Sequence, residues 1–391
     1  MAPTPSALEF EFARPGPDTL AQIINDSPEA EAANVLAVAY VDFDDSPRSI
    51  AGQIENAARS VGGTRCDAVL AALSEAAAHR DALINLVLNS ATHGDGFPSI
   101  WITKPDGTYG VASELLTPIL PPGKAGDKLV RVVLGVLVAS GRVEVSTAVC
   151  GLHVHYGAVS SFGHLKALRR PGQSQGAALR SAAMKRAQVW LAEVYQYFQP
   201  VIDSILPRSR RGSQNQNGGS ELRTADRWYY GRKGRNEATK RDFIHNPHRS
   251  AGGSGGSDGR YYKINFEALD KHGTVEFRQH QGTLSATKAL MWGRVCAALW
   301  ARAVNPAYSH LDCRRFSVDV GGFCSFLGLG QKTHRFLAGR ARHFDFAAIA
   351  GGDYDRSRGS QLRTAAARRE YARQHETEHT ATSGSRGGRE A

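Results

Sequence analysis

Three pairs of polar residues constrain the fold of this chain more than any other feature, because a single apolar residue separates the two members of each pair. The pairs are Glu9 and Glu11, His153 and His155, and Glu276 and Arg278, with Phe10, Val154 and Phe277 between them. Side chains alternate across a β-strand, so each pair predicts two polar groups on one face of a strand. The sequence therefore predicts a sheet with one buried face and one face that carries carboxylates, imidazoles and a guanidinium.

The residue types on this polar face are suited to a divalent cation and to phosphate. Mg²⁺ prefers oxygen ligands, which Glu9, Glu11, Glu114 and Glu276 can supply, and Mn²⁺ accepts a histidine as well. An arginine beside a metal suits the charge of a transferred phosphoryl group. Taken singly, such pairs are more often solvated carboxylates, hydrogen-bonded imidazoles or surface ion pairs. Their joint occurrence in apolar-flanked strands favours a functional site.

Composition permits a large core and leaves the number of domains open. The chain has 391 residues, 41% of them hydrophobic, enough for one large domain or two smaller ones. The 5 cysteines show no Cys-x-x-Cys spacing, which argues against a disulfide framework or structural zinc. The longest apolar run, residues 129–139, is too short to span a bilayer, and the N-terminus lacks the apolar core of a signal peptide. We therefore expect a cytoplasmic protein with no membrane segment.

The formal net charge of +11 is distributed unevenly along the chain. Residues 1–120 contain 16 Asp or Glu against 6 Lys or Arg, whereas residues 206–249 contain 11 Lys or Arg against 4 Asp or Glu. A basic segment of this kind can cover a site for nucleotide phosphates and acidic substrates, can bind nucleic acid, or can be solvated surface. The charge distribution alone does not choose among these interpretations.

Hydrophobic periodicity and turn residues predict a chain of mixed strands and helices. Strands are expected at 8–13, 99–103, 109–116 and 149–156, with a hairpin at 260–266 and 272–278. Helices are expected at about 49–88, 126–140, 176–206 and 285–304, the last with Ser285 as its N-cap. Residues 212–259 are expected to form a flexible basic insert rich in Gly and Ser, and residues 351–391 a polar, disordered tail.

Longer motifs around these pairs resemble the amidoligase family, which is related to glutamine synthetase and to glutamate–cysteine ligases. The two specific blocks are Cys150-Gly151-Leu152-His153-Val154-His155 and Gly273-Thr274-Val275-Glu276-Phe277-Arg278-Gln279-His280-Gln281-Gly282-Thr283. Weaker matches are the Glu-x-Glu strand, the segment 113–118 with Thr117 in place of the family's Ser, the Tyr-x-x-Asn element at 262–265, and Trp292. The resemblance spans residues 8–305 and departs from the family pattern just before Glu9, where Ala7 and Leu8 replace an expected Gly.

The resemblance implies both a fold and an activity. The fold is α+β, with a glutamine-synthetase-like catalytic core in which helices cover one face of a curved, largely antiparallel sheet. Residues 1–310 would form the catalytic domain, and residues 311–350 a C-terminal extension of its core. The implied activity is that of an ATP- and Mg²⁺-dependent (or Mn²⁺-dependent) carboxylate–amine ligase, which forms an amide or isopeptide bond through an acyl phosphate.

The resemblance also implies two groups of metal ligands. Glu11 and Glu114 would hold a metal near the carboxyl substrate. Glu9, His153 and Glu276 would hold a metal on the phosphates of ATP.

The remaining site residues would act on the nucleotide. His155 would contact the nucleotide or its phosphates, and Arg278 would stabilise the transferring phosphoryl group, so that Arg278, Glu276 and His155 are the catalytic candidates. Arg210 and Arg211, in the basic segment, would close over the phosphates.

Two other functions stay open. A zinc-dependent hydrolase would use His153 and His155 to hold Zn²⁺ and activate water. A nucleic-acid-binding protein would use the basic insert, but this function leaves the three polar pairs unexplained. For the ligase, the expected partners are a small amino acid, an amine, or an acidic peptide or protein, and nucleic acid is the less favoured partner. The sequence does not indicate an oligomeric state.

Overall fold

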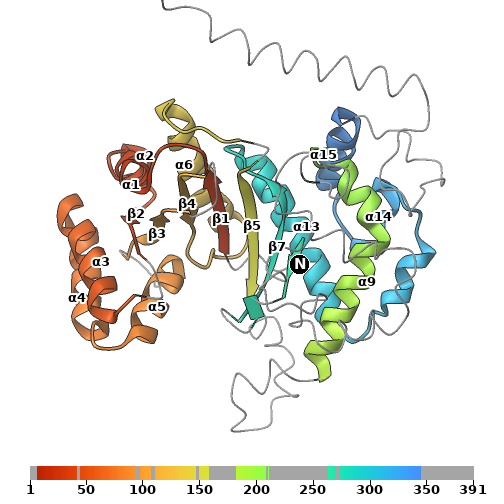
Figure 1. Cartoon of the computed structure of the whole chain (residues 1–391), viewed down its shortest axis with the longest axis horizontal. Coiled ribbons are helices and arrows are strands. Elements are labelled where there is room, and N and C mark those ends of the chain that lie inside the picture. Colours follow the sequence, from red (N-terminus) through yellow and green to blue (C-terminus); the bar gives the residue numbers. More distant parts are fainter. Residues whose placement is uncertain are drawn as a thin grey trace, which may run out of the picture.

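A seven-stranded sheet forms the centre of the protein in the computed structural model (Figure 1). Its strands are β1 (Ala7–Phe12), β2 (Val35–Ala39), β3 (Ser99–Lys104), β4 (Ser113–Leu116), β5 (Gly151–Gly157), β6 (Ile264–Asn265) and β7 (Thr274–Gln281), in the spatial order β2-β3-β4-β1-β5-β7-β6. Only β2 and β3 are parallel neighbours in this sheet. The predicted α+β class with a largely antiparallel sheet is confirmed, and the glutamine-synthetase-like core stays a prediction.

The structure describes residues 7–41, 45–92, 97–106, 111–146, 149–157, 182–207, 210, 263–266, 268–269 and 273–344. The predicted insert at 212–259, the predicted tail at 351–391 and Arg211 lie outside these residues. Within the described ranges, no helix combines the length and the apolar character that a membrane span requires.

The helices are α1 (Pro17–Asn25), α2 (Pro28–Ala32), α3 (Pro47–Val61), α4 (Thr64–Ala76), α5 (Arg80–Asn89), α6 (Lys124–Ser140), α9 (Ala182–Ser204), α13 (Ala286–Val304), α14 (Val320–Leu327) and α15 (Gln331–His343), with the 3-10 helices η1 (Ser90–Thr92) and η5 (His310–Arg315). The helical region predicted at 49–88 forms three helices, α3, α4 and α5. Gly62 and Gly63, with φ values of 68° and 79°, separate α3 from α4. Residues 77–79 separate α4 from α5. Ser285 is the N-cap of α13, as predicted, and its side chain accepts a hydrogen bond from the Lys288 amide.

The strands that carry the polar pairs bury their apolar face as the alternation predicts. Phe10, Val154 and Phe277 are each no more than 1% exposed and belong to the main hydrophobic cluster. Helices α6, α9 and α13 contribute to the same cluster, so they lie on this side of the sheet (Figure 1). The opposite side of β1, β5 and β7 is the side on which the polar pairs lie.

At the other end of the sheet, helices pack on both faces. Val35 and Ala37 of β2 join the main cluster with α1 and α2, whereas Leu36 and Val38 join a second cluster with α3, α4 and α5. The prediction placed helices on one face only, and for β2 and β3 it is wrong. The reason is that both sets of alternating side chains in β2 are apolar, as is typical of a strand buried on two sides.

The hairpin predicted at 260–266 and 272–278 is formed by a short β6 and a longer β7. β6 has only two residues, Ile264 and Asn265, which pair with Phe277 and Glu276 of β7. β7 continues to Gln281, past the predicted end, and its register against β5 shifts between Leu152 and Val154. The pairing brings Glu276 beside β5 on one side and β6 on the other.

Candidate active site

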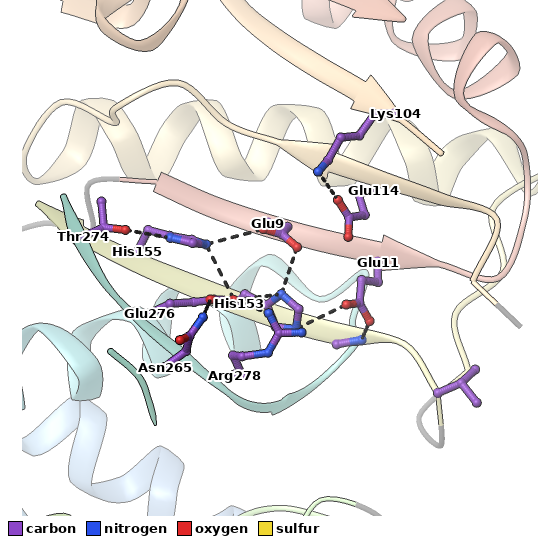
Figure 2. A network of polar contacts seen from close by, with 12 residues as sticks. Glu9, Glu11, Lys104, Glu114, His153, His155, Asn265, Thr274, Glu276 and Arg278 are labelled. Atoms are coloured by element: carbon purple, nitrogen blue, oxygen red, sulfur yellow. Dashed lines mark hydrogen bonds and ion pairs between the residues drawn. The ribbon is translucent and has the colours of Figure 1, made fainter. Parts of the chain in front are cut away.

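The strand order brings the three polar pairs together on one face of the sheet. β1 lies between β4 and β5, and β7 lies on the far side of β5. In the register, Glu9 is opposite His153, and Glu11 is opposite Glu114. His155 is opposite Glu276. Because side chains directly opposite on neighbouring strands are in contact distance, four strands present their polar groups to a common space (Figure 2).

His153 lies at the centre of this group, with carboxylates near both of its ring nitrogens. Its Nδ1 is 2.9 Å from Glu9 Oε1 and 3.4 Å from Glu276 Oε1, and its Nε2 is 3.2 Å from Glu11 Oε1. The side chain of His153 is 3% exposed. The imidazole therefore connects three acids from two different strands on either side of β5.

His155 and Arg278 lie at the edge of the same group. His155 Nε2 is 3.4 Å from Glu9 Oε2, and its Nδ1 is 3.1 Å from the hydroxyl of Thr274. Arg278 Nη1 is 2.6 Å from Glu276 Oε1, and the side chain of Arg278 is 20% exposed. Arg278 therefore neutralises Glu276 while part of its side chain stays accessible to a ligand.

A second part of the site lies on β1 and β4. Lys104 Nζ, from the end of β3, is 2.8 Å from Glu114 Oε2. Glu11 accepts a hydrogen bond from the amide of Gly151 at the start of β5. Figure 2 shows Glu114 and Lys104 on one side of Glu9, and the histidines with Glu276 on the other.

Two groups of side chains in the described part of the chain could hold a metal ion. One is Glu9, His153 and Glu276, and the other is Glu9, Glu11 and Glu114, with candidate ligand atoms within 4.8 Å of one another in each. The first group contains the three residues that the resemblance implied for one metal, and the second contains the implied pair Glu11 and Glu114 together with Glu9. Three carboxylates in one group and two carboxylates with an imidazole in the other are donors that suit Mg²⁺ or Mn²⁺.

Burial and neighbouring charges shift the pKa values of the four carboxyl groups in two directions. Burial alone would raise the pKa of Glu9, but His153 and His155 outweigh it and hold that pKa well below its usual value. Burial likewise opposes ionisation of Glu276, yet Arg278 and the two histidines lower its pKa. The acids near the histidines and Arg278 are therefore held ionised.

The acids on the β4 side behave in the opposite way. Burial raises the pKa of Glu11 in spite of His153. Burial and the neighbouring charge of Glu9 raise the pKa of Glu114 to about 10, although Lys104 opposes the shift. These acids lack enough positive charge of their own, which a bound divalent cation would supply.

Comparison with known families agrees with this arrangement. A family model described as "Putative amidoligase enzyme" matches residues 9–300 and so covers all of the strands that carry the site. The chain belongs to the amidoligase family. Membership indicates that it is a ligase. Searches of curated proteins and of solved structures returned no match to this chain.

Most of the site residues predicted from sequence lie together in this amidoligase. Glu9, Glu11, Glu114, His153, His155, Glu276 and Arg278 form one connected group. Arg210 lies beside it and is 5% exposed, with its guanidinium donating to the backbone carbonyls of Val149 and Cys150 just before β5. Its predicted contact with phosphates, like that of Arg211, stays a prediction.

Three residues of the site were not predicted as functional. Asn265 donates to Glu276 Oε2 at 2.7 Å, Lys104 pairs with Glu114, and Thr274 contacts His155. Asn265 belongs to the Tyr-x-x-Asn element, which contributed to the resemblance without suggesting a contact. Asn265 therefore fixes the carboxylate of Glu276, which belongs to one of the two possible metal groups, and Thr274 fixes the ring of His155.

Proposed function

We propose that this member of the amidoligase family is an ATP- and Mg²⁺-dependent carboxylate–amine ligase that forms an amide or isopeptide bond. The observation that carries the proposal is the convergence of four carboxylates, His153 and Arg278 on one face of four adjacent strands. Such convergence does not stabilise a sheet, because it brings buried, like-charged carboxylates close to one another. A site that holds divalent cations for binding phosphates does need such converging acids.

The residues present fit divalent metal ions. Among the described residues, Lys104 and Arg278 form ion pairs with these carboxylates, and Arg210 lies near Glu11. The pKa values of Glu11 and Glu114 stay raised in spite of these cations, so a divalent ion would favour their ionised forms, and the oxygen-rich donor groups match Mg²⁺ or Mn²⁺. When bound, the metals would neutralise the charge of the phosphates and orient them for transfer.

The reaction that we propose has two steps. A substrate carboxylate oxygen attacks the γ-phosphorus of ATP, the bond to ADP breaks, and an acyl phosphate forms. An amine nitrogen then attacks the acyl carbon, phosphate leaves, the amide forms, and the proton of the amine passes to solvent. No covalent enzyme intermediate is required, so the protein acts by positioning and by electrostatic stabilisation.

The protein's own groups have distinct parts in this reaction. Arg278 is partly exposed and held by Glu276, so it can contact a phosphoryl group that gains negative charge during transfer. His155 is oriented by Thr274 and Glu9 and would contact the nucleotide phosphates. The expected substrates are an amino acid, or an acidic peptide or protein, together with an amine.

The zinc hydrolase is a weaker candidate. It requires His153 and His155 to bind one ion, but within the described residues each group of possible metal ligands contains at most one histidine. His155 instead interacts with Glu9 and Thr274.

Calorimetric titration with a non-hydrolysable ATP analogue tests the proposal. The wild type should bind the analogue only with Mg²⁺ or Mn²⁺, and Glu276→Gln should lose this binding because it removes a ligand charge and leaves Arg278 unpaired. Glu55→Gln is the matched control, because Glu55 forms an exposed ion pair with Arg59 in α3, away from the site. Absence of nucleotide binding in the folded wild type under every metal condition would reject the proposal, as would wild-type affinity in Glu276→Gln.

A further inference from the structure

Arg340, in the last turn of α15, is buried and has no counter-charge among the residues that the structure describes. Arg340 is 8% exposed, and its Nε donates to the carbonyl of Ile205 at 3.1 Å. Its guanidinium also lies 4.7 Å from the ring centre of Phe344. Its Nη2 is buried without a hydrogen-bond partner, and the described residues give Arg340 no ion pair. Native proteins rarely bury a guanidinium in this way.

A lysine and a buried indole lie with Arg340 around the neutral imidazole of His280. His280 follows Arg278 by two residues in β7 and lies 5.5 Å from Trp292 of α13, measured between ring centres. The indole N–H of Trp292 is buried and has no acceptor. Lys288 precedes Trp292 by one helical turn, so the two side chains lie on the same face of α13. The end of β7, the N-terminal half of α13 and the last turn of α15 therefore bring Trp292, Lys288 and Arg340 around His280.

The electrostatics of this region agree with the geometry. Burial lowers the pKa of His280 to about 3, and the charges that lower it further are those of Arg340, Arg210 and Lys288. Burial and Arg340 also lower the pKa of Lys288. The positive charges of Arg340 and Lys288 thus disfavour protonation of His280, as expected where the described residues place no anion beside it.

We propose that Arg340, Lys288 and Trp292 form a binding site for a small oxyanion between the end of β7, α13 and α15. An oxyanion would accept from the free Nη2 of Arg340 and from the indole N–H of Trp292, and would pair with Lys288. The N-terminal turn of α13 adds a favourable dipole. Phosphate and carboxylate groups share this chemistry, so either could occupy the site.

The site differs in place and in charge from the proposed active site. The register shift between β5 and β7 interrupts the alternation, so His280 does not share the face of Arg278. It pairs with Leu152, a residue of the main hydrophobic cluster, and Trp292 belongs to that cluster. The group therefore lies on the side of the sheet that the helices cover, whereas Glu276 and Arg278 lie on the polar side. The oxyanion site needs no metal, and this property allows the two sites to be tested separately.

Titration of the whole protein with inorganic phosphate, in EDTA and at constant ionic strength, tests the site. We expect the wild type to bind one phosphate. Arg340→Met should weaken phosphate binding by about tenfold or more, because it removes a charged hydrogen bond. Lys288→Gln should weaken phosphate binding several-fold. Arg335→Met, an exposed residue of the same helix, and Arg278→Met should bind as the wild type does. A parallel titration with acetate would assign the site to a carboxylate if acetate binds more tightly than phosphate.

Three results would overturn the proposal. They are no binding of phosphate or acetate by the wild type, unchanged binding in Arg340→Met, and loss of binding in Arg278→Met alone. If Arg340→Met does not fold, Lys288→Gln and Trp292→Phe decide, because the first changes a partly exposed side chain and the second keeps the aromatic packing. Wild-type phosphate affinity in both of these variants would then reject the site.

Discussion

Replacing Gly151 with Ala should damage the proposed metal site while leaving the fold largely intact. Gly151 begins β5, directly beneath the imidazole of His153 and beside the carboxylate of Glu11. A Cβ at this position would lie 2.6 Å from His153 Nε2 and 3.0 Å from Glu11 Oε2. Both neighbours are proposed metal ligands, so a single methyl group would disturb both groups of ligands.

The size of the disturbance follows from these distances. Ordinary contacts of a Cβ begin at 3.4 Å, so the imidazole would have to move by about 0.8 Å. His153 Nδ1 is 2.9 Å from Glu9 and cannot move that far without losing this bond. Overpacking of a buried site costs roughly 1–3 kcal/mol of stability. Loss of the groups that position a metal ligand lowers metal affinity by roughly 10–100-fold.

Calorimetric titration with Mn²⁺ measures the affinity, and urea unfolding measures the stability of the same sample. Gly135→Ala is the matched control, because a Cβ there meets nothing within 4 Å on α6. This control should bind metal normally and gain roughly 0.5–1 kcal/mol of stability from its higher helix propensity. A folded Gly151→Ala protein that binds Mn²⁺ as tightly as the wild type would refute the reasoning.

Two further predictions concern buried groups outside the metal site. His280 has a pKa of about 3 in the folded protein, against about 6.5 in the unfolded chain. Between these two values His280 takes up a proton only on unfolding. The free energy of unfolding should therefore fall by up to about 1.4 kcal/mol per pH unit on acidification. His280→Asn, which removes the titrating group among Arg340, Arg210 and Lys288, should reduce this slope in urea unfolding between pH 6.5 and 4.5, and an unchanged slope would contradict the assignment. The side chain of Lys263 is 0% exposed, and its Nζ lies 3.0 Å from Asp203 Oδ1. Lys263→Met should therefore lower the free energy of unfolding by roughly 3–5 kcal/mol, because it removes the cation beside a buried carboxylate. The double variant with Asp203→Leu should lose less stability than the sum of the two single changes. Strict additivity in chemical unfolding would exclude a coupled pair.

The faces of the strands could be predicted from sequence because alternation is a local property. Phe10 separates Glu9 from Glu11, and the backbone of a single strand is enough to place the Phe in the core and both Glu on the other face. The same reasoning predicted which residues around His153 and Glu276 would be buried. The parts of the site that depend on alternation within one strand were therefore accessible without a structure.

Contacts between strands could not be predicted from sequence in the same way. Glu9 and His153 are 144 residues apart, and no local pattern shows that they lie opposite each other. The resemblance to a family supplied that grouping. Lys104, Thr274 and Asn265 are single polar residues near strand ends, and their importance follows only from the register that places them beside Glu114, His155 and Glu276. The second helical layer was missed because β2 was not predicted as a strand, and its short apolar run does not show which helices cover its two faces.

The position of β1 explains why Glu9 belongs to both possible metal groups. β1 is the first strand in the sequence but lies in the middle of the sheet, with β4 on one side and β5 on the other. β4 brings Glu114 to one edge of β1, and β5 brings His153 to the other edge, with Glu276 of β7 beyond it. A carboxylate on the central strand can contact both sets of ligands, whereas one on β4 or β7 can contact only its own. The strand order alone therefore makes Glu9 the carboxylate shared by the two possible metal groups, and a change at Glu9 should affect both groups, whereas a change at Glu114 or Glu276 should affect only one.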